Sequence, residues 1–516
     1  MAAPFGRLRT PPRDVSAAAR RARELRQSLL GAALVACLAL LAAGTANAAA
    51  NAIGPAHRFA PRQLVVKFTG EARGHTVGLP RGAGVLATAR ALRAKPNVAY
   101  AEPNYAAHAS AVELEPVDPD DPGTLEPGAT GSTTIPGGWA TRQWDFLDYT
   151  GTATTKLPIS PGGIDAPGAW ANLEAVGRPG GQGVVVAVLD SGIAYRDLGT
   201  TYVRSPDFSA EQFVPGEDFV DRDRLPLDEN GHGTHVAGTI AEQTNNGIGM
   251  TGLAYGVKLM PVRVLNRANV GYANRIAAGI RFAVEHHAQV INMSFNFACG
   301  EKVPQVDEAL REAYEHGIVT VASGGNLSSS ASSAKSCVSE PATGPRVIGV
   351  GGTTEGGCIG SYSLAGKAID VVAPGGGEPA AGCPSILSRP IYQVTLKAGT
   401  TNEFAIPSNY AGTSMAAAHV SATVALILAS GVIPTGLRPE AKVRAVTQRL
   451  KVTARSLGYP KTVQGAGLID AARATTPGST GLATARAVRE RGRGGPFTQN
   501  SREVRSGSPS TPPPQS

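Results

Sequence analysis

Short apolar segments alternate with segments of helical length from about Trp139 to Ala474, and this alternation constrains the fold most strongly. Periodicity and length predict six strands and four longer helices. The strands are expected at Val184–Leu189, Lys258–Val264, Val290–Met293, Ile318–Val321, Val347–Val350 and Ile369–Val372, and the helices at Ala273–Glu285, Pro304–His316, Ser414–Leu428 and Pro439–Arg449. Apolar strands alternating with helices predict an α/β fold, in which a parallel sheet carries helices on both faces.

The charge of the chain is concentrated at its two ends. Of the net charge of +8, residues 1–27 carry +5 and residues 477–516 carry +4, which leaves −1 for the rest. Basic termini are typical of targeting or solvated segments, and a near-neutral body argues against nucleic-acid binding. With 516 residues, the chain is also too long for one compact domain.

The N-terminus has the three parts of a secretory signal peptide. Arginines precede an apolar run from Leu29 to Ala43, and a small-residue pattern follows it up to Ala48. This order predicts a signal peptide over residues 1–48 and export to the periplasm or the medium. The apolar run is short for a transmembrane helix, so no stable membrane span is expected. A twin-arginine signal at Arg20 and a lipid anchor at Cys37 are minor alternatives.

Two further segments are predicted to be flexible from their composition. Residues 111–138 are acidic and rich in Pro and Gly, which is typical of a linker. Residues 476–516 are rich in Arg, Gly, Ser and Pro and lack the apolar residues needed for a core, which predicts a disordered basic tail. The body therefore spans residues 139–475.

Three polar residues lie at the ends of predicted elements in the body. Asp190 follows the apolar run Val184–Leu189, where open α/β sheets place their sites. His232 lies between two glycines at the start of a predicted helix, and Ser414 begins another. Each residue taken alone is explained equally well as a capping or surface group. Together, a carboxylate, an imidazole and a hydroxyl are the parts of a nucleophilic catalyst.

The chain order Asp190, His232, Ser414 and the sequences around these residues resemble the subtilisin-like serine proteases, over the whole of residues 139–475. The resemblance implies a subtilisin-like fold and hydrolysis of protein or peptide substrates through an acyl-enzyme on Ser414. It also implies that Asn326 and the Ser414 N–H stabilise the oxyanion. A catalytically silent peptide-binding protein on the same fold is the alternative from another class.

The resemblance also assigns the substrate groove to two segments. One wall is expected at Ser294, Phe295 and Asn296, and the other at Ala322, Ser323 and Gly324. Pairing of the substrate backbone with such a segment as an added strand tolerates many sequences. Asn296 stands where the family has glycine, so its side chain is expected to narrow or reshape the groove. Neither wall is charged, which favours an apolar or mid-sized side chain before the cleaved bond.

A second departure from the family is Ala418, which stands where proline is expected. Alanine is tolerated in the first turn of a helix, so the helix is expected to form. This departure from the family leaves the orientation of the Ser414 side chain undetermined by the resemblance. A ligase-like variant that transfers the acyl group to an amine is therefore a further alternative.

Residues 49–110 resemble the family's propeptide. A strand is expected from Arg62 to Phe68, and the segment Lys95–Tyr105 closes the domain. The resemblance implies a small α/β domain that inhibits the enzyme of its own chain, with the strand near Tyr105 in the substrate groove. Cleavage would then fall between Tyr105 and Gly138. The residues alone predict an ordinary small α+β domain.

Four cysteines remain after removal of the predicted signal peptide. Export favours disulfides, and four cysteines allow three pairings. The resemblance to secreted bacterial members implies the pairs Cys299–Cys337 and Cys358–Cys383.

No metal or cofactor is expected in catalysis, because no Cys or His spacing typical of a metal site is present. The loop of residues 244–249 resembles a calcium loop of the family, with Asn246 as its side-chain ligand. Structural calcium therefore stays open, since the partner aspartate is not identified. The acidic run from Asp218 to Glu229 is interpreted as a solvated loop.

Overall fold

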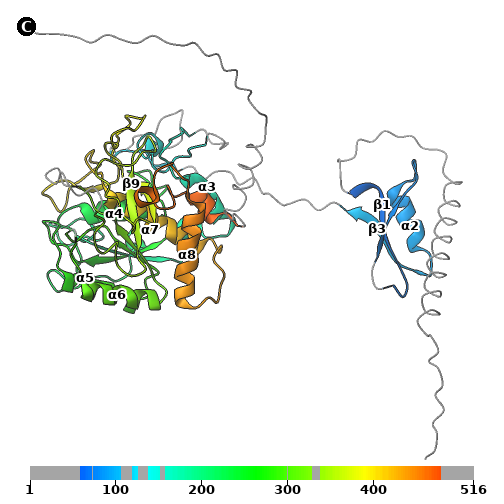
Figure 1. The fold of residues 1–516 in the computed structure, drawn as a ribbon, viewed down its shortest axis with the longest axis horizontal. Helices are drawn as coiled ribbons and strands as arrows, with labels where there is room; N and C mark the ends of the chain where they lie inside the picture. The colour runs from blue at the N-terminus through cyan, green and yellow to red at the C-terminus, as the bar shows by residue number, and fades with distance from the viewer. Residues whose placement is uncertain are drawn as a thin grey trace, which may run out of the picture. The chain divides into compact units, whose positions relative to one another are not determined.

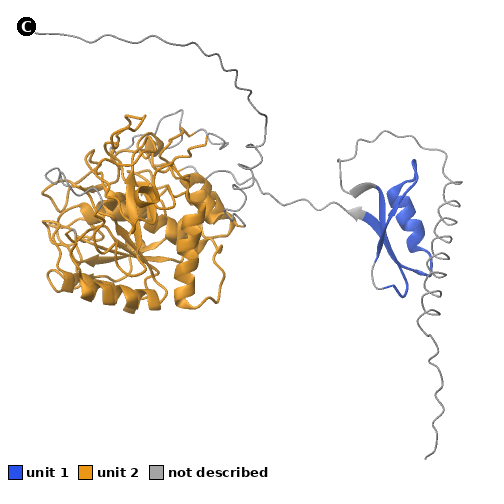
Figure 2. Ribbon diagram, in the orientation of Figure 1, with its two compact units in different colours: residues 1–113 blue, residues 114–516 orange. Residues whose placement is uncertain are grey.

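The structure is a computed structural model that describes residues 59–71, 74–105, 119–125, 138–150, 157–298, 300–327 and 337–477. The chain divides into two compact units, residues 1–113 and 114–516 (Figure 2). The predicted signal peptide, the alternative anchor at Cys37 and the tail beyond residue 477 lie outside the described residues. Within the described ranges, no helix is long and apolar enough to cross a membrane.

The smaller unit is a three-stranded antiparallel sheet with one helix. Its strands lie in the order β2-β1-β3, and their bounds are β1 Phe59–Phe68, β2 His75–Gly78 and β3 Val98–Tyr105. Helix α2, Val85–Arg93, covers the sheet through a small core of Leu64, Val66, Leu79, Ala89, Leu92 and Ala101. Leu64 and Val66 are two residues apart on β1, so both point to this face.

The larger unit is built on a seven-stranded parallel sheet with the order β10-β9-β8-β7-β4-β6-β5. Its strands are β4 Val185–Asp190, β5 Glu217–Asp218, β6 Lys258–Arg263, β7 Val290–Met293, β8 Val319–Ser323, β9 Ile348–Thr353 and β10 Val371–Pro374. The six strands predicted from the sequence are confirmed within three residues at each end. Strand β5 has two residues and is too short to produce a periodic pattern.

Helices cover both faces of this sheet, as predicted (Figure 1). Along β4, Val186 and Val188 belong to one core, whereas Ala187 and Leu189 belong to the other, because neighbouring residues of a strand point to opposite faces. The first core includes residues of α3 Ala166–Ala175, α4 His232–Ala241, α7 Thr413–Ala429, α8 Pro439–Thr453 and α10 Ala471–Thr475. The second includes residues of α5 Ala273–Glu285 and α6 Pro304–Glu315.

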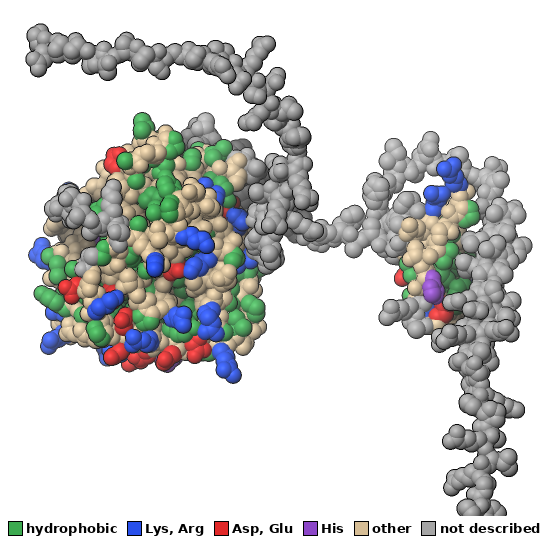
Figure 3. Space-filling view, viewed as in Figure 1, with side chains coloured by type: hydrophobic (Ala, Val, Ile, Leu, Met, Phe, Trp, Pro, Cys, Tyr) green, Lys and Arg blue, Asp and Glu red, His purple; other side chains and the backbone are tan. Residues whose placement is uncertain are grey.

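The remaining elements are short. They are helix α9 Lys461–Gln464, the 3₁₀ turns η1 Gly138–Thr141, η2 Pro179–Gly181 and η3 Ala210–Gln212, and the antiparallel pair β11 Thr395–Leu396 and β12 Phe404–Ala405. The outer faces of α5 and α6 carry charges of both signs, which include an ion pair of 3.1 Å between Arg281 and Glu312. Figure 3 shows such acidic and basic side chains side by side along this edge of the larger unit.

Helix α7 lies in the core and is apolar on every side, which is the pattern of a fully buried helix. From Met415 to Ile427 every residue is buried, whereas Ser414 in the first turn is partly exposed. The helix is regular through Ala418, so the prediction that alanine is tolerated at this position is confirmed.

Part of the predicted linker belongs to the larger unit. Residues 119–125 are held by main-chain hydrogen bonds, among them Gly123 N–H to the Gly249 carbonyl at 2.8 Å and Trp139 N–H to the Asp121 carbonyl at 3.1 Å. Asp121 is fully buried. The acidic, proline-rich composition predicted flexibility, but this short segment is ordered by backbone bonds to distant residues, which composition does not reveal.

Candidate active site

The carboxylate of Asp190 lies at the carboxyl end of β4, an inner strand between β7 and β6, and is fully buried. Its Oδ1 accepts hydrogen bonds from Nδ1 of His232 at 2.7 Å and from the N–H of Ser191 at 2.7 Å. Among the described residues, Oδ2 has no hydrogen-bond partner. The strand end therefore holds the carboxylate directly against the imidazole.

His232 is the first residue of α4, and the glycines on both sides of it are required there. Gly231 has φ of 99°, which favours glycine. A Cβ on Gly233 would lie 2.1 Å from the carbonyl oxygen of Gly192, so only glycine fits. The glycines thereby let the helix start close enough to β4 for His232 to reach Asp190.

The environment of His232 favours a protonated ring more than water does. Burial lowers the pKa of His232, but the charge of Asp190, its hydrogen bond to the ring and the charge of Asp228 outweigh this effect, so the pKa is raised above 6.5. Because Nδ1 is bound to Asp190, the ring nitrogen left to act as a base is Nε2.

The acidic run before His232 is only in part the solvated loop that was predicted, because Asp221 and Asp223 are exposed but other acids of the run form structural contacts. Asp228 is buried and accepts hydrogen bonds from Ser191 Oγ and from the N–H groups of Asn230, Gly231 and Thr234. Three of the other acids surround one buried guanidinium. Arg263 makes ion pairs with Asp218 at 2.8 Å, Asp221 at 2.6 Å and Glu229 at 2.6 Å. Arg263 lies on another strand, β6, and is far away in sequence from the acids that it pairs with. The acidic composition of the run alone therefore suggested exposure to solvent.

Ser414 is held against the end of β7. Its Oγ donates to the main-chain carbonyl of Ser294 at 3.0 Å, and Ser294 Oγ donates to the carbonyl of Ser414 at 2.8 Å. Among the described residues no hydrogen bond joins Ser414 to His232, so the hydroxyl must rotate toward the imidazole before proton transfer. The N–H of Ser414 lies in the first turn of α7, where N–H groups lack an acceptor within the helix.

Asn326 lies beside Ser414, three residues after the end of β8. Its Oδ1 accepts hydrogen bonds from the N–H of Thr413 at 3.0 Å and from the Thr413 hydroxyl at 2.9 Å. The other amide atom, Nδ2, lies 3.0 Å from the position that a Cβ on Gly412 would occupy. Glycine at 412 therefore leaves room for this donor beside the nucleophile. Sequence reasoning missed Thr413, although its place directly before Ser414 is a usable signal.

The two predicted groove walls lie at the carboxyl ends of the neighbouring strands β7 and β8. On the first wall, Ser294 is buried and Phe295 is partly buried against the second core, whereas Asn296 is exposed. On the second wall, Ser323 forms hydrogen bonds with Asn296.

The place of Ala322 and Gly324 in the second wall stays a prediction, and the structure shows other contacts for both residues. Ala322 is fully buried in the second core. A Cβ on Gly324 would lie 2.6 Å from Ile369 and 2.9 Å from the Val350 carbonyl oxygen, so this residue faces β9. The resemblance named consecutive residues, but successive residues of a strand point in opposite directions.

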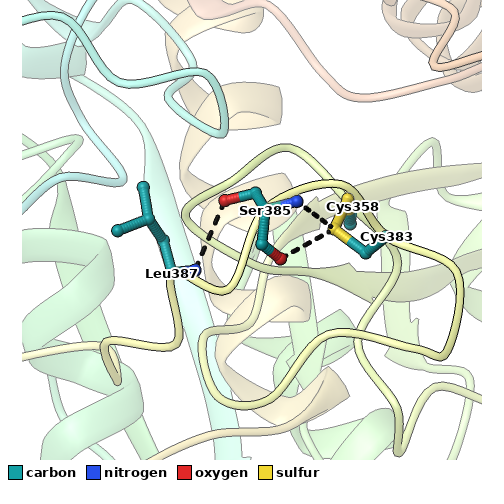
Figure 4. The surroundings of a disulfide bond; sticks show 4 residues. All are labelled: Cys358, Cys383, Ser385 and Leu387. Atoms are coloured by element: carbon teal, nitrogen blue, oxygen red, sulfur yellow. Dashed lines mark hydrogen bonds between the residues drawn. A yellow bond between two sulfur atoms is a disulfide. The ribbon is translucent and has the colours of Figure 1, made fainter.

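One predicted disulfide is confirmed. Cys358 and Cys383 are joined, with a Cα–Cα distance of 6.0 Å (Figure 4). The Cys383 sulfur also lies 3.0 Å from the main-chain oxygen of Ser385. Cys299 lies outside the described residues, so its pairing with Cys337 stays a prediction.

Two buried carboxylates contact the loop that resembles a calcium site. Asp207 accepts hydrogen bonds from Asn246 Nδ2 at 2.9 Å and from the Met250 N–H at 2.8 Å. Asp121 accepts from the N–H groups of Asn245 and Asn246, both at 3.3 Å. Burial raises the pKa of Asp121 to about 7 and that of Asp207 well above its ordinary value.

The described residues hold no cluster of three or more His, Cys, Asp and Glu that could bind a metal. A calcium site would therefore rest on the two carboxylates together with amide and carbonyl oxygens. Sequence reasoning missed both aspartates as partners of this loop. Asp121 is 125 residues away from Asn246 and lies in a segment that was interpreted as a linker.

The sequence matches known proteins across the body. The subtilase family profile matches residues 181–468. The extracellular protease of Xanthomonas campestris pv. campestris is 36% identical over 370 residues, which cover 66% of this chain and 56% of that protein. Thermitase of Thermoactinomyces vulgaris is 32% identical over 278 residues, which cover 54% of this chain and 84% of thermitase. The match thus spans little more than half of the Xanthomonas protein.

The fold has a solved relative as well. A protease from Pseudoalteromonas arctica superimposes with a TM-score of 0.52 and 29% identity, over 69% of this chain and 98% of that one. The family match covers more than half of the chain and includes Asp190, His232 and Ser414. The parallel sheet with helices on both faces is accordingly a subtilisin-like fold, and the chain belongs to the subtilase family of serine proteases.

Proposed function

We propose that the protein is an exported serine endopeptidase in which Asp190, His232 and Ser414 form the catalytic triad. The observation that carries the proposal is the 2.7 Å hydrogen bond between Asp190 Oδ1 and His232 Nδ1, beside a partly exposed serine at the start of a buried helix. Relatives named as proteases support the same activity.

In the first half of the reaction, Ser414 Oγ attacks the peptide carbonyl carbon and His232 Nε2 takes the hydroxyl proton. The imidazolium is stabilised by Asp190, which remains ionised. Collapse of the tetrahedral intermediate breaks the C–N bond. His232 gives its proton to the leaving amine, and the acyl group stays on Ser414 as an ester.

The second half repeats these roles with water. His232 removes a proton from water, the resulting hydroxide attacks the ester carbonyl, and the proton then returns to Ser414 Oγ as the acid leaves. In both halves the carbonyl oxygen becomes negative, and the donors for it are Asn326 Nδ2 and the Ser414 N–H. A donor of this kind contributes roughly 3–4 kcal/mol of transition-state stabilisation.

Labelling with a fluorophosphonate, a probe that reacts with activated serines, tests this proposal. The mature wild-type protein should be labelled and should cleave a casein substrate, and Ser414→Ala should lose both properties. Ser456→Ala, at an exposed serine outside the site, serves as the matched control. Wild-type protein that folds but is not labelled would instead indicate the silent peptide-binding alternative. Coupling of an added amine at the expense of hydrolysis would indicate the ligase-like one.

We also propose that the smaller unit is a propeptide that inhibits the enzyme until it is cleaved off. Its strand and helix arrangement and the protease relatives support this role. Because residues 119–125 pack into the larger unit, cleavage should fall between residues 106 and 118. N-terminal sequencing of the secreted protein measures this start directly. A mature chain that begins after residue 125 would contradict the proposal, and Ser414→Ala should remain uncleaved if maturation is self-catalysed.

We further propose that calcium stabilises the loop of residues 244–249. The two buried carboxylates of Asp121 and Asp207 supply the negative charge and hard oxygen ligands that calcium prefers. Asn246 donates its Nδ2 to Asp207, so its amide would have to turn for its oxygen to bind the ion. Calcium should raise the melting temperature of the mature wild type and should have a much smaller effect on Asp207→Asn. Equal shifts in both proteins would refute the site.

A further inference from the structure

The side chain of Asn296 joins the two predicted groove walls at the ends of β7 and β8, and the predicted groove between these walls is termed the crevice. Its Nδ2 donates to the main-chain carbonyl of Ser323 at 2.6 Å, and its Oδ1 accepts from Ser323 Oγ at 3.0 Å. Both polar atoms of the amide are thus bound to one residue of the opposite wall. Asn296 is exposed and Ser323 is fully buried, so the bridge lies at the mouth of the crevice.

This crevice is the place for the substrate side chain that precedes the cleaved bond. Strands β7 and β8 are neighbours, with Met293 opposite Ala322, so the segments that follow them diverge from adjacent strand ends. Ser414 Oγ lies 3.0 Å from the Ser294 carbonyl oxygen on one segment. The oxyanion donor Asn326 follows the other segment. A carbonyl held between Ser414 and Asn326 therefore places the neighbouring side chain over the crevice.

The Asn296 amide lies near Gly325, the residue that follows the second wall. A Cβ built on Gly325 of the second wall would lie 3.7 Å from Cγ of Asn296, which is ordinary van der Waals contact. On its other side, the same Cβ would lie 2.8 Å from Cδ1 of Leu364. A side chain at position 325 would therefore contact the Asn296 amide and clash with Leu364, which favours glycine here.

We propose that Asn296, bound to Ser323, closes this crevice to large side chains, so that the enzyme cleaves after glycine, alanine or serine. The inference rests on the proposed protease function and replaces the expectation of an apolar or mid-sized residue at this position. A large side chain can enter only when the Asn296 amide leaves the Ser323 carbonyl and hydroxyl. The buried Ser323 carbonyl would then lose this donor, which is unfavourable, whereas the Ser323 hydroxyl would keep its bond of 3.2 Å to the Phe295 carbonyl.

The experiment compares cleavage of two peptides that differ only in Ala or Phe before the cleaved bond. Each protein is first titrated with a fluorophosphonate, so that kcat/KM refers to active enzyme and failure of the proposed function is seen separately. The wild type should favour the Ala peptide, and Asn296→Gly should raise the Phe to Ala ratio of kcat/KM by at least about tenfold. Asn402→Gly is the matched control, since Asn402 is exposed and donates one side-chain bond of 3.0 Å to a main-chain carbonyl.

The Asn296→Asp variant tests whether large substrate side chains are excluded by the hydrogen bonds of Asn296 or only by the size of its side chain. Aspartate has nearly the size of asparagine but cannot donate to the Ser323 carbonyl, and its charge is repelled by that oxygen. It should therefore leave the crevice and also raise the Phe to Ala ratio. If Asn296→Gly is unstable, Asn296→Ala provides the same measurement. A wild type that prefers Phe, or a ratio unchanged within about threefold in every titratable Asn296 variant, would overturn the proposal.

Discussion

Thr413 holds the side chain of Asn326 by two hydrogen bonds to the same oxygen. Its N–H and its hydroxyl both donate to Oδ1, at 3.0 and 2.9 Å. The Thr413 hydroxyl in turn accepts from the N–H of Gly325 at 3.3 Å. Since Oδ1 is occupied in this way, the amide can present only Nδ2 to a substrate oxyanion. The residue before the nucleophile thus orients the donor that the nucleophile needs.

Replacing Thr413 with valine should therefore slow the chemical step. Thr413→Val removes the hydroxyl but keeps the N–H, so Asn326 loses one of its two fixed contacts. We expect kcat to fall by about fivefold with KM little changed, because one hydrogen bond of this kind contributes roughly 1 kcal/mol. Asn326→Ala should be more severe, with a loss of about 10²–10³ in kcat.

Steady-state kinetics with active-site titration measure both effects. Thr447→Val, which removes a partly buried hydroxyl bound to a carbonyl within α8, is the matched control. An unchanged kcat in Thr413→Val would show that one contact is sufficient to orient Asn326.

The raised pKa of His232 predicts the pH dependence of catalysis. The ring must be neutral to take the proton from Ser414, and Asp190 and Asp228 raise its pKa above 6.5 despite burial. Activity should accordingly be lost as the pH falls through an apparent pKa above 6.5. The acid limb of kcat/KM against pH measures this value.

Asp190→Asn should move the acid limb of kcat/KM to lower pH. Without the carboxylate charge, burial lowers the pKa of His232, so the ring stays neutral to lower pH. At the same time kcat should fall by about 10⁴, since the amide no longer favours the tautomer with Nε2 free or stabilises the imidazolium. An acid limb that stays in place in this variant would assign the titration to another group.

The candidate catalytic residues could be predicted because each lies at a boundary that local patterns define. An apolar run ends at Asp190, and an apolar helix begins at Ser414. The order of the strands in the sheet, by contrast, is set by packing between elements far apart in sequence. The same is true of the bridge from Asn296 to Ser323, where the sequence indicated a reshaped groove but not the partner.

The predictions that differed from the structure share one cause. The segment around Asp121 and the acidic run before His232 were interpreted from composition, which suggested solvent-exposed chain. Two of the acids are instead held by long-range partners, Asp218 by Arg263 and Asp121 by the Asn246 N–H. Composition reports how polar a segment is, but not which buried groups those polar atoms bind.

A second buried acid–imidazole pair supports the helix that carries Ser414. His419 Nε2 lies 2.8 Å from Asp145 Oδ2, and its Nδ1 lies 2.9 Å from the Met415 carbonyl oxygen. Both side chains of the pair are fully buried. Asp145→Ala should lower the free energy of unfolding by about 3–5 kcal/mol, because the imidazole would keep its burial and lose its partner.

Denaturant unfolding in the Ser414→Ala background measures this loss without self-digestion. Glu312→Ala is the control, since it breaks an ion pair with Arg281 that is exposed on both sides. That change should cost only about 0–1 kcal/mol. Equal losses in the two variants would mean that the Asp145–His419 pair contributes no more than a surface ion pair.

The carboxylate of Asp121 should make the calcium-free enzyme less stable as the pH rises. Burial raises its pKa to about 7 in the folded protein, against 3.8 for an exposed aspartate. Between these values the folded state binds more protons than the unfolded state, so the free energy of unfolding falls as the pH rises from about 4 to 7. In Asp121→Asn, residue 121 does not ionise, so this contribution to the pH dependence of the free energy of unfolding should be absent.

Thermal unfolding in EDTA at pH 5 and pH 7, in the Ser414→Ala background, compares the two proteins. The melting temperature of the Asp121→Asn variant relative to its parent should rise between pH 5 and pH 7, by about 2–4 °C for each kcal/mol removed. Added calcium should reverse the order at pH 7, because the ion binds the ionised carboxylates of the parent and stabilises only its folded state. A difference between the two proteins that does not change with pH would show that Asp121 does not titrate between these values. Calcium that shifts both proteins equally would place the ion away from Asp121.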